Sequence, residues 1–228
     1  MVGAGRVLDG DALAEDPEGP GLVGDHHGQR NGRDERRARL GCGYGSLSVM
    51  RLLPGPVEGA VAVTVVSLEM TDPADLVDAV PPAGASIEVV AESRPDLSES
   101  FYRRVGADWA WVDRLPWGAE QWADWVDRPE HHLIVCRLDG VDAGYAELEE
   151  QGDGSVEIAY FGLLPQSIGR GLGGWLLART IELAWSLPGT ERVWVHTCDL
   201  DGPAALPNYR ARGLRECARA VEWRMPDG

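Results

Sequence analysis

The sequence predicts an α/β domain with about seven strands, and two observations support this prediction. First, three strand-like runs follow one another at residues 131–138, 141–149 and 155–164, with turn signals at residues 139–140 and 151–154 between them. Second, the third run leads into a glycine-rich segment and then into a long apolar run that has helical spacing. Hairpins that pass through glycines into a helix indicate a mixed α/β fold.

The remaining elements follow from the same periodicities. They are expected at residues 61–70 (strand), 71–80 (turn or short helix), 86–91 (strand), 97–105 (helix), 118–127 (helix), 171–186 (helix), 192–198 (strand), 203–212 (helix) and 214–225 (closing strand or hairpin). The helix after the glycines has apolar residues on both faces, which predicts that it is largely buried.

Residues 1–49 differ in composition from the rest of the chain. They contain eleven glycines and clustered charges, without helical or strand periodicity. Such a segment buries too little apolar surface to offset its chain entropy, so we expect it to be disordered. Because Met50 and Met70 are internal methionines, this extension is also interpreted as a mis-annotated start. The folded domain is expected over residues 50–228.

Charge and hydropathy limit the partners. The formal net charge is −16 and the isoelectric point is near 4.6, so nucleic acid is not an expected partner. The acidity would attract a cationic or amine substrate, or it serves only solubility. No apolar stretch reaches the length of about 18 residues that spans a bilayer, so no membrane partner is expected.

Cysteine usage predicts neither zinc nor disulfides. The four cysteines have no CxxC spacing and no nearby histidine pair. We expect them to be unpaired in a reducing cytoplasm, and we expect no metal.

The segment from Gln166 to Gly174 lies where a strand passes into a helix, a position suited to binding phosphate. A Walker A loop is excluded because the chain contains no lysine. Gly169, Gly171 and Gly174 also fit a GxGxxG dinucleotide fingerprint, with Asp199 as its acidic partner. Too few residues follow Asp199 to complete a dinucleotide-binding domain.

A third pattern, QxxGxG, is formed by Gln166, Gly169 and Gly171. Together with the later segment Asn208–Leu214, which matches YxxxG(F/L), it resembles the acyl-CoA-binding signature of the GNAT superfamily of N-acyltransferases. The likeness covers residues 61–225. One departure is Gly202, which stands where that family often has an asparagine.

The resemblance implies a mixed central sheet flanked by helices on both faces, with acetyl-CoA as co-substrate. The cofactor-binding residues that it implies are Phe161, Gly162, Leu163, Leu164, Gln166, Ser167, Ile168, Gly169, Arg170, Gly171, Leu172, Gly173, Gly174 and Asn208. In the family, backbone N–H groups of this loop bind the pyrophosphate.

Acyl transfer to an amine needs a base for the amine and an acid for the leaving thiolate. The resemblance favours Glu157, on the strand before the loop, as the base, acting directly or through water. Glu147 and Glu149 on the preceding strand are alternatives. Tyr209 is the expected acid, because the tyrosine of the late motif lies near the coenzyme sulfur in the family.

The acceptor site is expected in the segment between the two early helices. Its candidate residues are Trp109, Trp111, Asp113 and Trp117, together with His196 on a later strand. The tryptophans can equally be core residues of a small domain.

The sequence therefore predicts transfer of an acetyl group from acetyl-CoA to a primary amine of a small molecule or peptide. A non-catalytic acyl-CoA sensor and an NAD-type oxidoreductase remain as alternatives. Family members also commonly form homodimers.

Overall fold

A computed structural model describes residues 58–225, so the expectation that residues 1–49 are disordered lies outside the described residues. The strands are β1 Val61–Met70, β2 Ala85–Val90, β3 His131–Leu138, β4 Val141–Glu150, β5 Ser155–Leu163, β6 Arg192–Cys198 and β7 Arg215–Arg224. The helices are α2 Pro95–Gly106, α3 Ala119–Val126, α4 Leu172–Ser186 and α5 Ala205–Ala211, with short 3-10 turns η1 Pro73–Asp75 and η2 Pro165–Ser167.

The seven strands form one mixed sheet in the order β2-β3-β4-β5-β6-β1-β7, which confirms the predicted α/β class and strand number. The closing element is a single strand, β7. None of the described helices is long and apolar enough to cross a bilayer.

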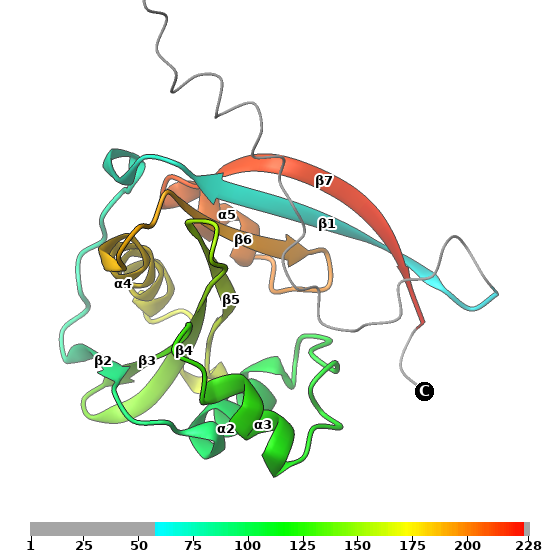
Figure 1. Cartoon of the computed structure of the whole chain (residues 1–228), viewed down its shortest axis with the longest axis horizontal. Helices are drawn as coiled ribbons and strands as arrows, with labels where there is room; N and C mark the ends of the chain where they lie inside the picture. The colour runs from blue at the N-terminus through cyan, green and yellow to red at the C-terminus, as the bar shows by residue number, and fades with distance from the viewer. Residues whose placement is uncertain (1–57, 226–228) are drawn as a thin grey trace, which may run out of the picture. The chain divides into compact units, whose positions relative to one another are not determined.

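The first strand lies inside the sheet, next to the edge strand β7, rather than at an edge. Strand β1 pairs antiparallel with β6 on one side and with β7 on the other (Figure 1). Its side chains on both faces are buried, including Val65, Val66 and Leu68. A continuous apolar run of this kind is typical of a strand that is covered on both faces.

Helices cover both faces of the sheet, as expected. Leu172, Leu176 and Ile181 of α4 belong to the larger apolar core on one face. On the other face, Phe101 of α2 stacks on Tyr145 of β4 with 5.1 Å between ring centroids. Helix α3 packs beside α2 (Figure 1).

Strands β5 and β6 diverge shortly after they meet. Their parallel pairing consists of three residue pairs and ends at Glu157 and Trp194. Strand β5 then bulges, because Tyr160 pairs with Glu147 and Ile158 with Leu148, which leaves Ala159 as an extra residue. From residue 158 to residue 163, β5 has no partner on its β6 side among the strands that the structure describes, so that edge of its backbone is open to them.

A buried charged cluster holds the helices of one face against the sheet. The Glu147 carboxylate, fully buried on β4, accepts hydrogen bonds from the Trp125 indole at 2.7 Å and from the Ser98 hydroxyl. Arg114 Nη1 lies 3.5 Å and His131 Nε2 3.4 Å from the same carboxylate. Burial alone would raise the pKa of Glu147, but His131 and Arg114 outweigh it and lower the pKa to about 2.

Candidate active site

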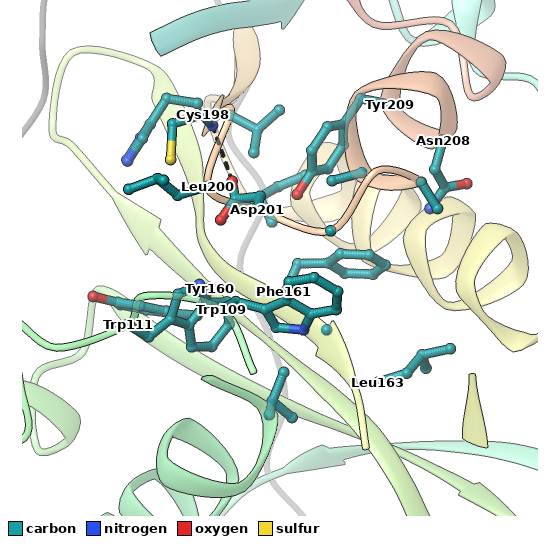
Figure 2. Close-up of a pocket in the computed structure, with 18 of the residues that line it drawn as sticks. Trp109, Trp111, Tyr160, Phe161, Leu163, Cys198, Leu200, Asp201, Asn208 and Tyr209 are labelled. Atoms are coloured by element: carbon teal, nitrogen blue, oxygen red, sulfur yellow. Dashed lines mark hydrogen bonds between the residues drawn. The ribbon is translucent and has the colours of Figure 1, made fainter. Parts of the chain in front are cut away.

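A cavity of about 620 Å³ occupies the space where β5 and β6 diverge. Its walls are the open stretch of β5, the start of α4, the β6–α5 connection, β7 and the segment between α2 and α3. Figure 2 shows Tyr209 and Asn208 on the α5 side of this cavity, and Trp109, Trp111 and Tyr160 across from them.

The glycine-rich segment forms one end of the cavity. Gly169 and Gly171 have φ angles of 80° and 78°, a left-handed conformation that favours glycine. Gly171 caps α4 without a side-chain hydrogen bond, and the first turn of α4 carries no acidic residue. The N–H groups of that turn are therefore available to an anion such as a pyrophosphate.

Two further glycines at this end have room for a Cβ atom at ordinary van der Waals distance from their neighbours. A Cβ atom at Gly173 would meet nothing nearer than 3.7 Å, and one at Gly174 nothing nearer than 3.6 Å. Packing within the protein therefore does not require glycine at either position, whereas close approach of a ligand would. This observation fits the coenzyme A pyrophosphate predicted for the loop.

Helix α5 places its two candidate residues beside the loop. Asn208 Nδ2 donates to the Gly173 carbonyl at 3.2 Å. Tyr209 is buried against Phe161, with 6.1 Å between ring centroids, and its side chain faces the cavity (Figure 2). Burial, with a smaller contribution from the charge of Asp201, raises the pKa of Tyr209 and keeps its phenol protonated.

Glu157 lies at the last pair of the β5–β6 ladder. Its Oε2 accepts from Gln151 Nε2 at 2.7 Å, and Gln151 Oε1 accepts in turn from the Trp194 indole at 3.0 Å. Its Oε1 lies 3.2 Å from Nδ1 of His196 on β6. Burial lowers the pKa of His196, but the adjacent Glu157 carboxylate more than offsets this, and the pKa is raised.

The α2–α3 segment supplies an aromatic wall with a fixed carboxylate. Asp113 accepts hydrogen bonds from the Tyr102 hydroxyl at 2.6 Å and the Tyr160 hydroxyl at 2.8 Å. Trp111 packs edge-on against Tyr160 at 5.1 Å. Asp113, Trp111 and Tyr160 all line the cavity.

The cavity brings together most of the residues that the sequence singled out. They are Trp109, Trp111, Asp113, Glu157, Phe161, Gly162, Leu163, Ile168, Gly169, Gly171, Gly173, Gly174, His196, Asn208 and Tyr209, and of the alternative bases Glu149.

Six of the predicted residues are not among those that line the cavity. Leu164 and Leu172 are fully buried core residues, and Ser167 is also buried. Gln166 and Arg170 are exposed. Trp117 packs against Trp122 in the cluster around Arg114, with 5.1 Å between ring centroids. Any contact of these residues with a ligand stays a prediction.

Two glycines serve packing between segments. A Cβ at Gly162 would approach Val105 of α2 to 2.3 Å, so this glycine leaves room for that helix. A Cβ at Gly202 would lie 3.2 Å from the Trp109 ring. The departure from asparagine at residue 202 therefore coincides with a tryptophan that fills the adjacent space.

Several functional candidates were missed from the sequence. Gln151 was assigned only to a turn, Asp201 and Glu222 had no motif, and Arg114 is a buried cation that lines the cavity. The one usable sequence signal concerned β7, where Glu222 and Arg224 are two residues apart and therefore lie on the same face of the strand. Both line the cavity.

The cysteine prediction needs one correction. Cys136 and Cys198 are free thiols, but Cys217 is disulfide-bonded, so the expectation that every cysteine is unpaired is wrong at that residue. Within residues 58–225, no cluster of His, Cys, Asp or Glu is arranged to hold a metal ion.

Comparison with known families agrees with this geometry. The model of the acetyltransferase (GNAT) family matches residues 95–214, which run from α2 to the end of the late YxxxGL motif. The chain belongs to the GNAT acetyltransferase family. The GxGxxG pattern in this GNAT protein is therefore a coincidence of glycine spacing, and acetyl-CoA is the co-substrate typical of the family.

Solved structures show the same GNAT fold. A GCN5-related N-acetyltransferase from Kribbella flavida is 26% identical, with a TM-score of 0.55, over 75% of this chain and 61% of that one. Another from Sphaerobacter thermophilus is 20% identical, with a TM-score of 0.56, over 72% and 52%. The chain thus spans 52% to 61% of the length of these two relatives. A comparison with curated proteins found no match.

Proposed function

We propose that the protein transfers an acetyl group from acetyl-CoA to a primary amine. The observation that carries this proposal is the shared cavity, which unites the open edge of β5, the uncapped start of α4, Glu157 and Tyr209. Membership of an acetyltransferase family supports the donor.

Two parts of the chain would hold acetyl-CoA, which supplies the activated acetyl thioester. The N–H groups between Gly169 and Gly174 would bind its pyrophosphate at the start of α4. The open edge of β5, from residue 158 to residue 163, offers backbone groups for the pantetheine arm. An N–H group of that edge would polarise the thioester carbonyl.

Two side chains would manage the protons. Glu157 would remove the proton from the attacking amine, directly or through a water molecule. Tyr209, which burial keeps protonated, would donate its proton to the leaving thiolate. Both line the cavity.

The acceptor would bind against the aromatic wall. Trp109, Trp111 and Asp113 line the part of the cavity formed by the α2–α3 segment. A carboxylate beside aromatic faces favours a cationic group, which agrees with an amine acceptor and with the acidity of the chain. Trp117 and His196 remain in this proposal as further candidates near the acceptor.

Two measurements test the function. In thermal-shift experiments, acetyl-CoA and coenzyme A should stabilise the protein by about 2.7 kcal/mol at 100 times Kd, while NAD should not. Thiol release from acetyl-CoA in the presence of an amine panel should then exceed release without amine. Binding without amine-dependent thiol release would instead identify a non-catalytic acyl-CoA sensor.

A further inference from the structure

Glu157 is poorly placed to meet an amine by itself. Its side chain is 4% exposed, and both carboxylate oxygens already have a neighbour. Gln151 donates to Oε2, and His196 lies beside Oε1. A carboxylate held in this way is suited to orienting a second group that does contact the amine.

His196 occupies the position of such a group. It follows the last β5–β6 pair by two residues on β6, so its side chain lies on the same face of the strand as Trp194, the partner of Glu157. The side chain is 34% exposed and lines the cavity. Since Nδ1 faces Glu157, Nε2 is the nitrogen left for the cavity, and it has no hydrogen bond to any residue from 58 to 225.

We infer that His196 is a catalytic residue, the general base that takes the amine proton at Nε2, and that Glu157 is its positioning residue. This inference rests on the proposed function and puts an imidazole in place of the bridging water. The N–H bond of the substrate ammonium breaks, and a new N–H bond forms at Nε2. The freed lone pair then attacks the thioester carbonyl, while the Glu157 carboxylate stabilises the imidazolium.

The charges around His196 favour this role. Glu157 on β5, Asp201 in the β6–α5 connection and Glu222 on β7 all raise its pKa. Glu222 is itself paired with Arg224 at 2.9 Å, and Asp201 accepts from the Thr197 hydroxyl at 2.6 Å. Three carboxylates around one imidazole make it a stronger base and attract an ammonium group.

The first test is the pH dependence of kcat/KM for an amine that supports thiol release. Wild-type activity should rise with pH through the pKa of His196, because only the neutral imidazole accepts a proton. His196→Gln should lower kcat/KM on the order of 10²-fold and remove that rise. His196→Ala should regain activity on addition of imidazole, which a purely structural defect would not show.

The second test measures the titration of His196 by NMR, using His196→Gln to assign its signal. Glu157→Gln should lower the pKa of His196, since it removes the adjacent opposite charge. Glu149→Gln is the matched control. It removes a carboxylate directly opposite Glu157 on β4 that lines the same cavity but pairs with Arg128 at 2.7 Å. It should leave the titration in place.

The outcomes separate the inference from the proposed function. If wild-type protein releases thiol with an amine and His196→Gln does so at the same rate and with the same pH dependence, His196 is not the base. A His196 titration that Glu157→Gln leaves unchanged also overturns the pairing. No thiol release by wild-type protein with any amine would instead overturn the proposed function, and the catalytic role with it.

Discussion

At the scale of single residues, Gly173 allows the proposed binding of coenzyme A to be tested separately from folding. It lies in the first turn of α4 and lines the cavity, and a Cβ there would lie 3.7 Å from the nearest atom, an ordinary van der Waals contact without a clash. Gly171 offers no such separation, since its φ of 78° strains any side chain whether or not a ligand is present. Substitution at Gly173 therefore tests the proposed ligand contact without straining the backbone.

Gly173→Ala should weaken coenzyme A binding at least about tenfold, equivalent to 1.4 kcal/mol, because its methyl group blocks close backbone approach. Stability should hold or rise, since alanine is favoured over glycine within a helix. Calorimetric titration and thermal unfolding measure the two effects. Gly118→Ala, at an exposed glycine with free space and outside the cavity lining, is the control. Unchanged affinity for coenzyme A would contradict the proposal that the glycine loop binds its pyrophosphate.

Tyr209→Phe should slow turnover on the order of 10²-fold, because it removes the proton donor while preserving the ring that packs on Phe161. Coenzyme A affinity should change little. Tyr145→Phe provides the control, because the Tyr145 hydroxyl is buried without a hydrogen-bond partner in the described part of the chain. Equal rates for both variants would assign Tyr209 a packing role only.

The sequence predicted the glycine loop and Tyr209 as site residues because their motifs depend on local spacing, and the structure places Gly169, Gly171 and Tyr209 in the lining of one cavity. The sequence missed Gln151, which donates to Glu157 from a turn, and Asp201, which lines the cavity from the loop after β6, because both positions depend on the tertiary arrangement of the strands. A partner such as His196 for Glu157 depends on cross-strand register, which a single sequence does not specify.

At the scale of elements, the cluster around Glu147 joins α2, α3, β3 and β4. Its members are Ser98, Trp125, His131 and Arg114. Strand alternation alone does not distinguish such a buried carboxylate from an exposed one. The sequence therefore offers Glu147 as an alternative base, whereas the structure surrounds it with structural partners.

Glu147→Gln should lower the free energy of unfolding at pH 7 by about 3 kcal/mol, because Arg114 is left as an uncompensated buried charge. The folded-state pKa of Glu147, about 2, lies below the ordinary 4.5, so its contribution is complete above pH 4.5 and is lost as the pH falls towards 2.

Urea unfolding between pH 7 and pH 2.5 measures this contribution. The difference between wild-type protein and Glu147→Gln should shrink as the solution becomes acidic. Glu120→Gln, at an exposed position in the first turn of α3, should track wild-type protein throughout. A constant gap between wild-type protein and Glu147→Gln would show that its partners do not depress the Glu147 pKa.

At the scale of the whole described domain, the position of β1 in the sheet is the main feature that could not be predicted from the sequence. The bounds of β1 were predicted correctly, since its ten-residue apolar run is a local signal. Its insertion between β6 and β7 brings residues 61–70 beside residues 192–198 and 215–224. Pairing between strands so far apart in the sequence produces no local periodicity from which it could be predicted.

Val66→Pro should therefore unfold or strongly destabilise the domain. Proline removes an N–H group and cannot be accommodated in a strand that is paired on both sides. Val80→Pro, in a connection where the side chain is 87% exposed and two prolines follow, should be tolerated. Far-UV circular dichroism and thermal melting distinguish them. A well-folded Val66→Pro would contradict the interior position of β1.

Trp109 of the α2–α3 segment packs beside Gly202 of the β6–α5 connection, and its ring leaves little space for a side chain at residue 202. A larger residue at 202 and an indole at 109 compete for one space, so their substitutions should be non-additive. Among homologues, a larger side chain at one of these two positions should accompany a smaller one at the other. The summed volume of the two side chains should therefore vary less than the volume of either one. The acceptor wall and the loop before Tyr209 would then change together when specificity changes.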